Sequence, residues 1–245
     1  MKQALDLSFI IPAYNEEDRI ADSLEKVISY LENQSYSYEI LLVDDGSKDK
    51  TVEIASKFAP KVRIVSYNEN RGKGAAVTYG MLNAMGEIRV FSDADLSTPV
   101  YELKKMLVEF TNENCDIVIG NRADDVSLVK VHQPFYREFM GKTFNKLVQL
   151  FVFRGITDTQ CGFKGFRKHV AEDLFSKTLI PGFSFDVEIL YLAKKMRYNI
   201  RQISVEWYND ERSKVNPIKD SFKMFRDILR IKKIHKHTEF KLSNK

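Results

Sequence analysis

Between residues 5 and 122, short apolar runs alternate with amphipathic helical patterns. Runs such as "SFIIPA" and "YEILLVDD" alternate with longer stretches in which apolar residues recur every three or four positions. Such alternation is typical of βαβ units, in which helices cover both faces of a parallel sheet. We therefore predict an α/β fold with a mostly parallel central sheet. The predicted strands are 5–13, 38–45, 62–67, 87–93 and 115–122, and the predicted helices are 16–32, 47–58, 74–85 and 99–110.

The pattern is less regular after Arg122. No internal repeat and no long linker interrupts this half of the chain. We expect a catalytic domain over 1–211, followed by a basic amphipathic segment over 212–245. The predicted elements are a loop over 123–134, a helix over 135–153, a loop, strand and helix over 158–175, a helix over 185–196, a strand over 200–207 and a helix over 217–237.

Charge is distributed unevenly along the chain. The net charge is +4, yet residues 212–245 hold 11 Lys and Arg against 3 Asp and Glu. A basic segment on an acidic body indicates an anionic ligand or surface at that end. No nucleic-acid-binding module accompanies the charge, so nucleic acid is not an expected partner.

The cysteines and the apolar runs bear on the compartment. Cys115 and Cys161 lie far apart and form no CxxC pair, which favours two free thiols in a reducing compartment over a disulfide or a metal cluster. The first residues lack the apolar stretch of a signal peptide, and no run reaches the roughly 18 apolar residues of a membrane span. We expect a cytoplasmic protein that does not cross a bilayer.

Polar residues gather where the predicted strands end. The first, second, fourth and fifth strands run into "PAYNE", "VDDGS", "SDAD" and "GNR". Ligands of open α/β sheets bind outside the carboxyl ends of the strands. A binding site is therefore predicted at this edge of the sheet.

Four carboxylates would meet at that edge, namely Asp44, Asp45, Asp93 and Asp95. Residues two apart in an extended segment point to the same side, so Asp93 and Asp95 could converge on one ion. A hard cation such as Mg²⁺ or Mn²⁺ uses one or two carboxylates together with phosphate oxygens of a substrate. The alternative is a solvated turn in which Asp95 or Ser97 caps the following helix.

The loop "NENRGKGAA" places Arg71 and Lys73 beside glycines before a predicted helix, which suits an anion. The alternative is a basic surface turn. The chain has no GxGxxG after its first strand and no GxxxxGK[ST], so dinucleotide oxidoreductases and P-loop enzymes are disfavoured.

These segments together resemble a known family. "FIIPAYNEE", "LLVDDGSKDKT", "NRGKGAAVTYGM", "FSDADLSTP" and "DIVIGNR" are similar to successive motifs of family 2 glycosyltransferases with the GT-A fold. "DTQCGFKGF" and "VEWYNDERSKV" resemble the dolichyl-phosphate glucosyltransferase branch, near dolichyl-phosphate mannose synthase. The resemblance covers about residues 7–232. The chain departs from the branch in lacking a membrane span and in having Glu211 and Arg212 where a small residue is usual.

The resemblance implies roles for individual residues. Asp93 would face the ribose and the donor sugar, and Asp95 would bind a Mg²⁺ or Mn²⁺ that bridges the diphosphate. The nucleotide sugar, UDP-glucose or alternatively GDP-mannose, would contact Pro12, Ala13, Tyr14, Glu16, Asp44, Asp45, Arg71, Lys73 and Asp93. The phosphate of a polyprenyl acceptor would bind Arg122, Arg137, Arg212 and Lys214.

Asp158 occupies the place of a catalytic carboxylate in inverting relatives. A sugar hydroxyl acceptor needs a general base, whereas a lipid monophosphate is largely ionised at neutral pH. With a polyprenyl phosphate acceptor, Asp158 would therefore orient a substrate rather than remove a proton. Alternatively, the residue is a loop aspartate that caps a turn.

The C-terminal segment fits a lipid acceptor. On a helical wheel Ile218, Phe222, Phe225 and Leu229 form an apolar stripe. Basic residues flank this stripe, namely Lys219, Lys223, Arg226, Arg230 and Lys233. Such a helix can lie in a membrane interface, while the alternative is a helix that packs on the domain with a solvated basic face.

The expected function is an inverting, metal-dependent transfer of a hexose, with glucose first, from a nucleotide diphosphate sugar to a polyprenyl or dolichyl phosphate. We expect the enzyme to act peripherally at the cytoplasmic face of a membrane. One alternative keeps the fold but uses a glycan or other hydroxyl acceptor, with Asp158 as the general base. Another alternative is a non-catalytic nucleotide-sugar-binding or membrane-scaffold protein.

Overall fold

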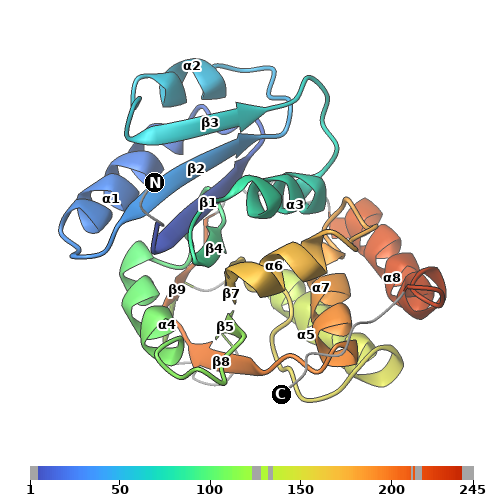
Figure 1. The fold of residues 1–245 in the computed structure, drawn as a ribbon. Helices are drawn as coiled ribbons and strands as arrows, with labels where there is room; N and C mark the ends of the chain where they lie inside the picture. Colours follow the sequence, from blue (N-terminus) through green and yellow to red (C-terminus); the bar gives the residue numbers. More distant parts are fainter. Residues whose placement is uncertain (1–4, 123–127, 132–134, 211, 213–216, 239–245) are drawn as a thin grey trace.

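The computed structural model describes residues 5–122, 128–131, 135–210, 212 and 217–238, and for 135–138 and 217–220 it describes the backbone alone. The strands are β1 (Leu7–Ala13), β2 (Tyr38–Asp44), β3 (Val62–Ser66), β4 (Ile88–Ser92), β5 (Ile117–Asn121), β6 (Val129–Val131), β7 (Phe163–Arg167), β8 (Ile200–Ser204) and β9 (Trp207–Tyr208). The helices are α1 (Ile20–Glu32), α2 (Thr51–Ser56), α3 (Lys73–Asn83), α4 (Leu103–Glu109), preceded by a 3-10 turn at Val100–Glu102, α5 (Phe135–Phe151), α6 (Lys168–Phe175), α7 (Phe185–Lys195) and α8 (Pro217–Ile234). Figure 1 shows their arrangement.

Within the described residues, seven strands form one sheet in the order β3-β2-β1-β4-β7-β5-β8. Every pairing in this sheet is parallel except those of β7, which is antiparallel to both β4 and β5. This confirms the predicted mostly parallel sheet. Because β7 runs the opposite way, it begins at the edge where β4 ends, and Ser92 pairs with Phe163 there.

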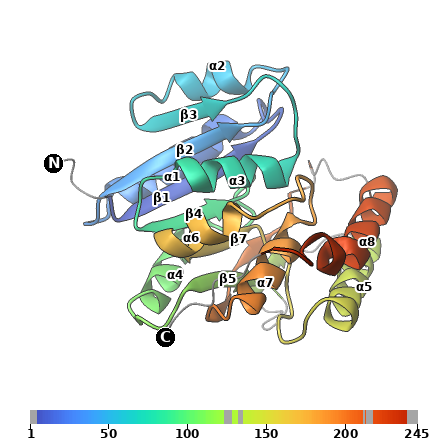
Figure 2. The same cartoon turned by 45° about the vertical axis from the view of Figure 1, so that its right-hand side comes forward.

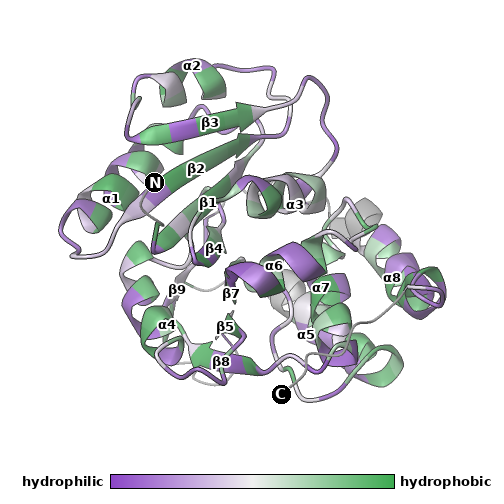
Figure 3. Ribbon diagram, in the orientation of Figure 1, coloured by the Kyte–Doolittle hydropathy of each residue, from purple (hydrophilic) through white to green (hydrophobic). Residues whose placement is uncertain are grey.

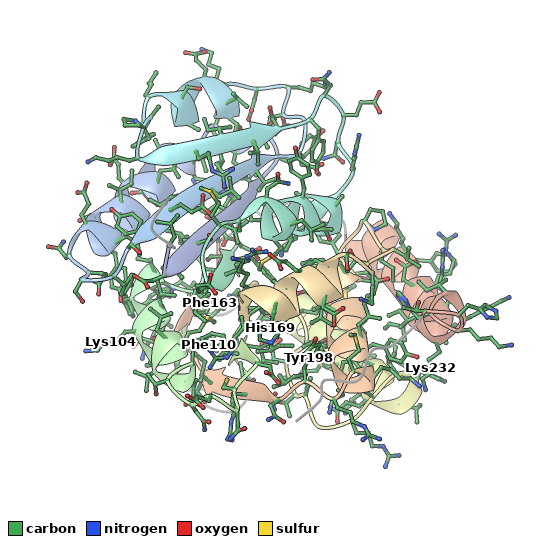
Figure 4. All side chains as sticks on the ribbon, viewed as in Figure 1. Lys104, Phe110, Phe163, His169, Tyr198 and Lys232 are labelled. Carbon is green, nitrogen blue, oxygen red and sulfur yellow. The ribbon has the colours of Figure 1, made fainter. Side chains whose placement is uncertain are left out.

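Alternating side chains of the strands build two apolar clusters, one on each face of the sheet. Ile10 of β1 belongs to the cluster under α3, α6 and α7, whereas its neighbours Phe9 and Ile11 belong to the cluster under α1 and α4. Figure 3 shows the apolar colouring along the central strands. In Figure 4, Phe110 and Phe163, which both belong to the second cluster, lie near α4 and the sheet. The period of two along each strand produces this division.

One part of the predicted pattern is wrong. The predicted loop 123–134 contains β6, which pairs in parallel with β9, and the predicted strand 200–207 ends at Ser204 before β9 begins. Strand β6 has only three residues and is stabilised by pairing with a strand 77 to 78 positions away, and local periodicity does not report such a partner. The other residues of this predicted loop, save 128, lie outside the described part.

Helix α8 packs on the body of the protein. It lies beside α5 in both ribbon views (Figures 1 and 2), and its side chains Ile228 and Ile231 are fully buried in the cluster under α7. The C-terminal helix is thus continuous with the apolar core.

Both cysteines, Cys115 and Cys161, are buried free thiols.

Candidate active site

The carboxyl ends of β1, β2, β4 and β5 lie at one edge of the sheet, as predicted. Two cavities adjoin this edge, one of about 440 Å³ and one of about 190 Å³. Four side chains line both cavities and so stand at their boundary, namely Lys73, Asp93, Asp95 and Phe183. The edge therefore has room for two ligands that would meet at the two aspartates.

Most of the residues predicted to bind a nucleotide sugar surround the larger cavity. Asp44 and Arg71 do not line it: Asp44 is buried and accepts a hydrogen bond from the backbone of Ser47, and Arg71 is exposed with its guanidinium 4.8 Å from the ring centre of Tyr67. The predicted residues that do line the cavity are Pro12, Ala13, Tyr14, Glu16, Asp45, Lys73 and Asp93.

Asp45 orders the loop that follows β3. Its carboxylate accepts hydrogen bonds from Asn70 Nδ2 at 2.9 Å and from the backbone N–H groups of Arg71 at 2.8 Å and Gly72 at 2.9 Å. Gly72 has a φ of 104°, and a Cβ there would lie 2.5 Å from the carbonyl oxygen of Pro181. Only glycine fits that approach, so the loop that leads into α3 is held against the segment before α7.

Lys73 and Asp93 form an ion pair, with Lys73 Nζ 2.6 Å from Asp93 Oδ1. Burial by itself lowers the pKa of Lys73, but the charges of Asp93, Asp186 and Asp95 outweigh it and the net pKa is raised. Gly162 lies directly against the carboxylate of Asp93, and there is no room for a larger residue because a Cβ at this position would lie 2.0 Å from Asp93 Oδ2. The antiparallel β7 brings Gly162 to this place, where its carbonyl accepts the backbone N–H of Asp93 at 3.1 Å.

Asp95 suits a cation. Burial raises its pKa, the charge of Asp93 raises it further, and one oxygen accepts the backbone N–H of Ser97 at 2.9 Å. A cation between two such carboxylates would relieve their repulsion. The described residues contain no group of three His, Cys, Asp or Glu that could hold a metal by themselves. The donor set therefore fits a hard divalent ion that takes its remaining ligands from phosphate oxygens and water.

A buried arginine that the sequence reasoning missed lines the larger cavity. Arg19 is 8% exposed and forms a two-pronged ion pair with Glu16, and its Nη1 lies 3.3 Å from Asp210 Oδ2. Asp210 also accepts two hydrogen bonds from the guanidinium of the exposed Arg212, which donates to the carbonyl of Asp18 at 3.3 Å. This network fastens the segment after β9 to the loop after β1. Arg19 follows "PAYNEED" directly, and this position after the first predicted strand was the only sign in the sequence that Arg19 belongs to the site.

Arg122 and Asp158 form one unit beside the smaller cavity. The guanidinium of Arg122 donates to both oxygens of Asp158, at 2.7 and 2.8 Å, and lies 5.4 Å from the ring centre of Trp207. Arg122 lines the cavity, whereas Asp158 is 2% exposed and does not. Burial by itself raises the pKa of Asp158, but the charge and hydrogen bonds of Arg122 outweigh it and lower the pKa.

A second buried ion pair was also missed. Lys164 Nζ lies 2.5 Å from Asp186 Oδ1, and both side chains are almost fully buried. Asp186 lines the smaller cavity, and its pKa is raised by burial although Lys164 and Lys73 oppose the shift. Lys164 lies on β7 and Asp186 on α7, so the sequence around either residue does not reveal that the two are paired.

Two predicted acceptor residues cannot be placed. The side chain of Arg137, at the start of α5, and the whole of Lys214 lie outside the described residues. Arg122 lines the smaller cavity, and Arg212 is held by Asp210 at the rim of the site.

Comparisons with known proteins agree with this architecture. The profile described as "Glycosyl transferase family 2" matches residues 8–175. The chain is 38% identical to a dolichyl-phosphate beta-glucosyltransferase of Drosophila melanogaster, over 93% of this chain and 74% of that protein. It is 34% identical to the enzyme of the same name from Homo sapiens, over 92% of this chain and 74% of that protein.

Solved structures share the fold. Glucosyl-3-phosphoglycerate synthase of Mycobacterium tuberculosis in complex with UDP has a TM-score of 0.67 at 22% identity, over 95% of this chain and 79% of that one. Mannosyl-3-phosphoglycerate synthase of Rubrobacter xylanophilus has a TM-score of 0.69 at 17% identity, over 97% of this chain and 77% of that one. At these identities the likeness concerns the fold, which is the predicted GT-A fold. By its sequence match over more than half its length and by its relatives, the chain belongs to glycosyltransferase family 2.

Proposed function

We propose that the protein transfers glucose from UDP-glucose to a dolichyl or other polyprenyl phosphate, with inversion at the anomeric carbon. The relatives that bear the name dolichyl-phosphate beta-glucosyltransferase support this reaction. The observation that carries the proposal is the pair of adjoining cavities. They share Asp93 and Asp95 at their boundary, and the smaller one contains the cationic side chain of Arg122.

In the proposed reaction, an oxygen of the acceptor phosphate attacks the anomeric carbon while the bond from that carbon to the UDP diphosphate breaks. UDP-glucose would occupy the larger cavity between the β1 loop and α3, with its sugar toward Asp93. Arg122 would hold the acceptor phosphate in the smaller cavity, in line with the bond that breaks. The electron pair of that bond leaves with UDP, and no proton has to move in this step.

A bound Mg²⁺ or Mn²⁺ would neutralise the charge that develops on the departing diphosphate. Asp95 would hold the ion, with one oxygen fixed by Ser97, and Asp93 would stay paired with Lys73. A solved structure of glucosyl-3-phosphoglycerate synthase contains Mn²⁺ and UDP-glucose, which supports a divalent ion for this fold.

The state of Asp158 supports a phosphate acceptor over a hydroxyl acceptor. A general base needs a pKa near the working pH and a free oxygen close to the proton that it takes. Both oxygens of Asp158 accept hydrogen bonds from Arg122, and the net pKa is lowered. We therefore assign Asp158 to the orientation of Arg122, which an ionised phosphate acceptor permits because it needs no base.

We also propose that the protein docks on the cytoplasmic face of a membrane, and the exposed side chains of α8 support contact with a membrane surface. Its side chains Phe222 and Leu229 are 72% and 52% exposed, and Phe225 lies on the same stripe. The described basic side chains beside this stripe are exposed as well, namely Lys223, Arg226, Arg230 and Lys233. Apolar burial in the interface and about 1 kcal/mol for each cation near anionic lipid would hold the helix there.

Among the described residues, no helix has both the length and the apolar character needed to span a membrane.

A donor-by-acceptor activity screen tests the proposal. We would incubate the full chain with UDP-glucose or GDP-mannose, a polyprenyl phosphate in anionic vesicles, and Mg²⁺, Mn²⁺ or a chelator. The expected product is glucosyl-phosphoryl-polyprenol, formed from UDP-glucose and lost on chelation. The absence of turnover with every polyprenyl phosphate would overturn the proposed acceptor, and full activity with chelator would overturn the metal role of Asp95.

A further inference from the structure

Helix α8 forms part of the wall of the larger cavity. Its residues Lys223, Met224 and Asp227 line the cavity, together with residues of the loop after β1 and with Gly182 and Phe183 of the segment before α7. A Cβ at Gly182 would lie 3.3 Å from Lys223 Nζ, so the ammonium group lies close to the backbone of that segment. The helix that carries the exposed apolar stripe thus also borders the proposed donor site.

The position of α8 is set by a buried polar contact. His235, just after the helix, has its Nε2 2.7 Å from Glu188 Oε1, and both side chains are fully buried. The carboxylate of Glu188 also accepts the backbone N–H groups of Leu179 and Ile180, each at 2.9 Å. One carboxylate therefore joins the end of α8 to the segment that leads to Phe183. These buried contacts hold α8 against the domain, and they therefore also hold Lys223 at the cavity.

The cations of the larger cavity differ in their partners. Lys73 is paired with Asp93, and Arg19 is paired with Glu16. Lys223 has neither an ion pair nor a hydrogen bond within the described part of the chain. An ammonium group at a cavity wall with no carboxylate partner is free to pair with an anionic ligand. The carboxylate of α8 that lines the cavity is that of Asp227, and its Oδ1 lies 3.9 Å from Arg230 Nη1.

We propose that Lys223 is a further donor-binding residue, whose ammonium group pairs with phosphate oxygens of the nucleotide sugar. The inference rests on the proposed function for the identity of the donor. Helix α8 would then serve both substrates, because one face borders the donor cavity and the opposite face exposes Phe222 and Leu229. Donor binding and contact with a lipid surface would then involve the same helix.

Binding of UDP to the full chain in the presence of Mn²⁺ and without vesicles tests the proposal. We would compare Lys223→Ala, Lys223→Arg and the matched control Lys232→Ala by calorimetry. Lys232 is an exposed lysine of the same helix, does not line the cavity and lies on its outer side in Figure 4. Loss of a charge-assisted contact at Lys223→Ala should weaken UDP binding about tenfold or more. Lys232→Ala should stay within about twofold of the unaltered chain, and Lys223→Arg should restore most of the affinity.

Unchanged UDP affinity in Lys223→Ala, or an equal loss in Lys232→Ala, would overturn the proposal. Matching melting temperatures of the three variants would show that the helix is still in place. The proposed function fails separately: a chain that binds UDP through Lys223 but transfers no glucose to any polyprenyl phosphate would contradict the acceptor and leave this inference standing.

Discussion

The guanidinium of Arg122 binds both carboxylate oxygens of Asp158, and the backbone N–H of Arg122 donates to the same carboxylate at 3.0 Å. Arg122 follows β5, whereas Asp158 lies in the segment before β7. The pair therefore joins two strand ends and fixes the one described arginine that lines the smaller cavity. Under the proposed function, these contacts suit Asp158 to hold Arg122 in position rather than to act as a base.

Replacement of this aspartate should separate the two substrates. In Asp158→Asn the guanidinium loses its charged partner and its fixed orientation, so the KM for polyprenyl phosphate should rise about tenfold or more. The Kd for UDP should change less than about twofold, because Asp158 does not line the larger cavity. Steady-state kinetics and calorimetry measure the two quantities, with the exposed Glu87→Gln as control. A kcat near zero with an unchanged acceptor KM would instead indicate a general base.

The same pair should make stability depend on pH. The pKa of Asp158 is lowered in the folded protein, so the carboxylate contributes stability above its unfolded-state pKa of about 4 and loses it as the pH falls through the lower folded-state value. The free energy of unfolding of the unaltered chain should exceed that of Asp158→Asn by about 3 kcal/mol near neutral pH. This difference should be constant from pH 8 to about 5 and should shrink below about pH 4. Urea denaturation at several pH values measures it, and a difference that persists to the lowest pH would contradict the assigned shift.

Gly162 should be required for the geometry of Asp93. In Gly162→Ala the new methyl group would lie 2.0 Å from Asp93 Oδ2, so the carboxylate must leave the position in which it pairs with Lys73. We expect a loss of glucosyl transfer of about a hundredfold, as for the misplacement of other reacting groups. The matched control is Gly141→Ala in α5, where no heavy atom lies within 4 Å of the new Cβ. That variant should keep its activity and gain about 0.5–1 kcal/mol of stability. Equal activity of the two variants would contradict the role of Gly162.

The buried pair of Lys164 and Asp186 should be costly to break from one side. Lys164→Met leaves Asp186 as a buried charge without its 2.5 Å partner, which should lower the free energy of unfolding by about 3–5 kcal/mol. The double variant Lys164→Met with Asp186→Leu should recover much of that loss, because no buried charge remains. A urea denaturation cycle of the single and double variants measures the coupling. Additive losses would show that the two residues do not interact.

The exposed stripe of α8 should matter for membranes and not for folding. Phe222→Ser with Leu229→Ser removes two exposed apolar side chains, so flotation with anionic vesicles should decrease while the melting temperature stays the same. Ile228→Ala, on the buried side of the same helix, should lower the free energy of unfolding by about 2–5 kcal/mol. Unchanged flotation of the double variant would remove α8 as the docking element.

Local periodicity was sufficient for the first half of the chain. Strands β1 to β5 and helices α1 to α4 follow from patterns of two and three to four residues, because each element must turn its own apolar face to a core. Parallel strands end at the same edge, so the sequence also placed Asp93 and Asp95 beside the residues that follow β1. The resemblance to the family was likewise carried by these strand ends, and the comparisons confirm it.

The rest depended on contacts between segments far apart in the sequence. Periodicity shows that a face is buried but not what covers it, so the insertion of β7 between β4 and β5, which brings Gly162 to Asp93, could not be read from it. The same holds for the pair of Lys164 and Asp186. Helix α8 has both an exposed apolar stripe and the buried Ile228 and Ile231, and a helical wheel does not distinguish which apolar side chains are covered. The order of residues along the chain specifies which of them could form a core and which edge of the sheet would be polar. The folded arrangement is needed to tell which charges are paired inside the protein and which remain free for a ligand, because pairing depends on distances between elements that the chain brings together on folding.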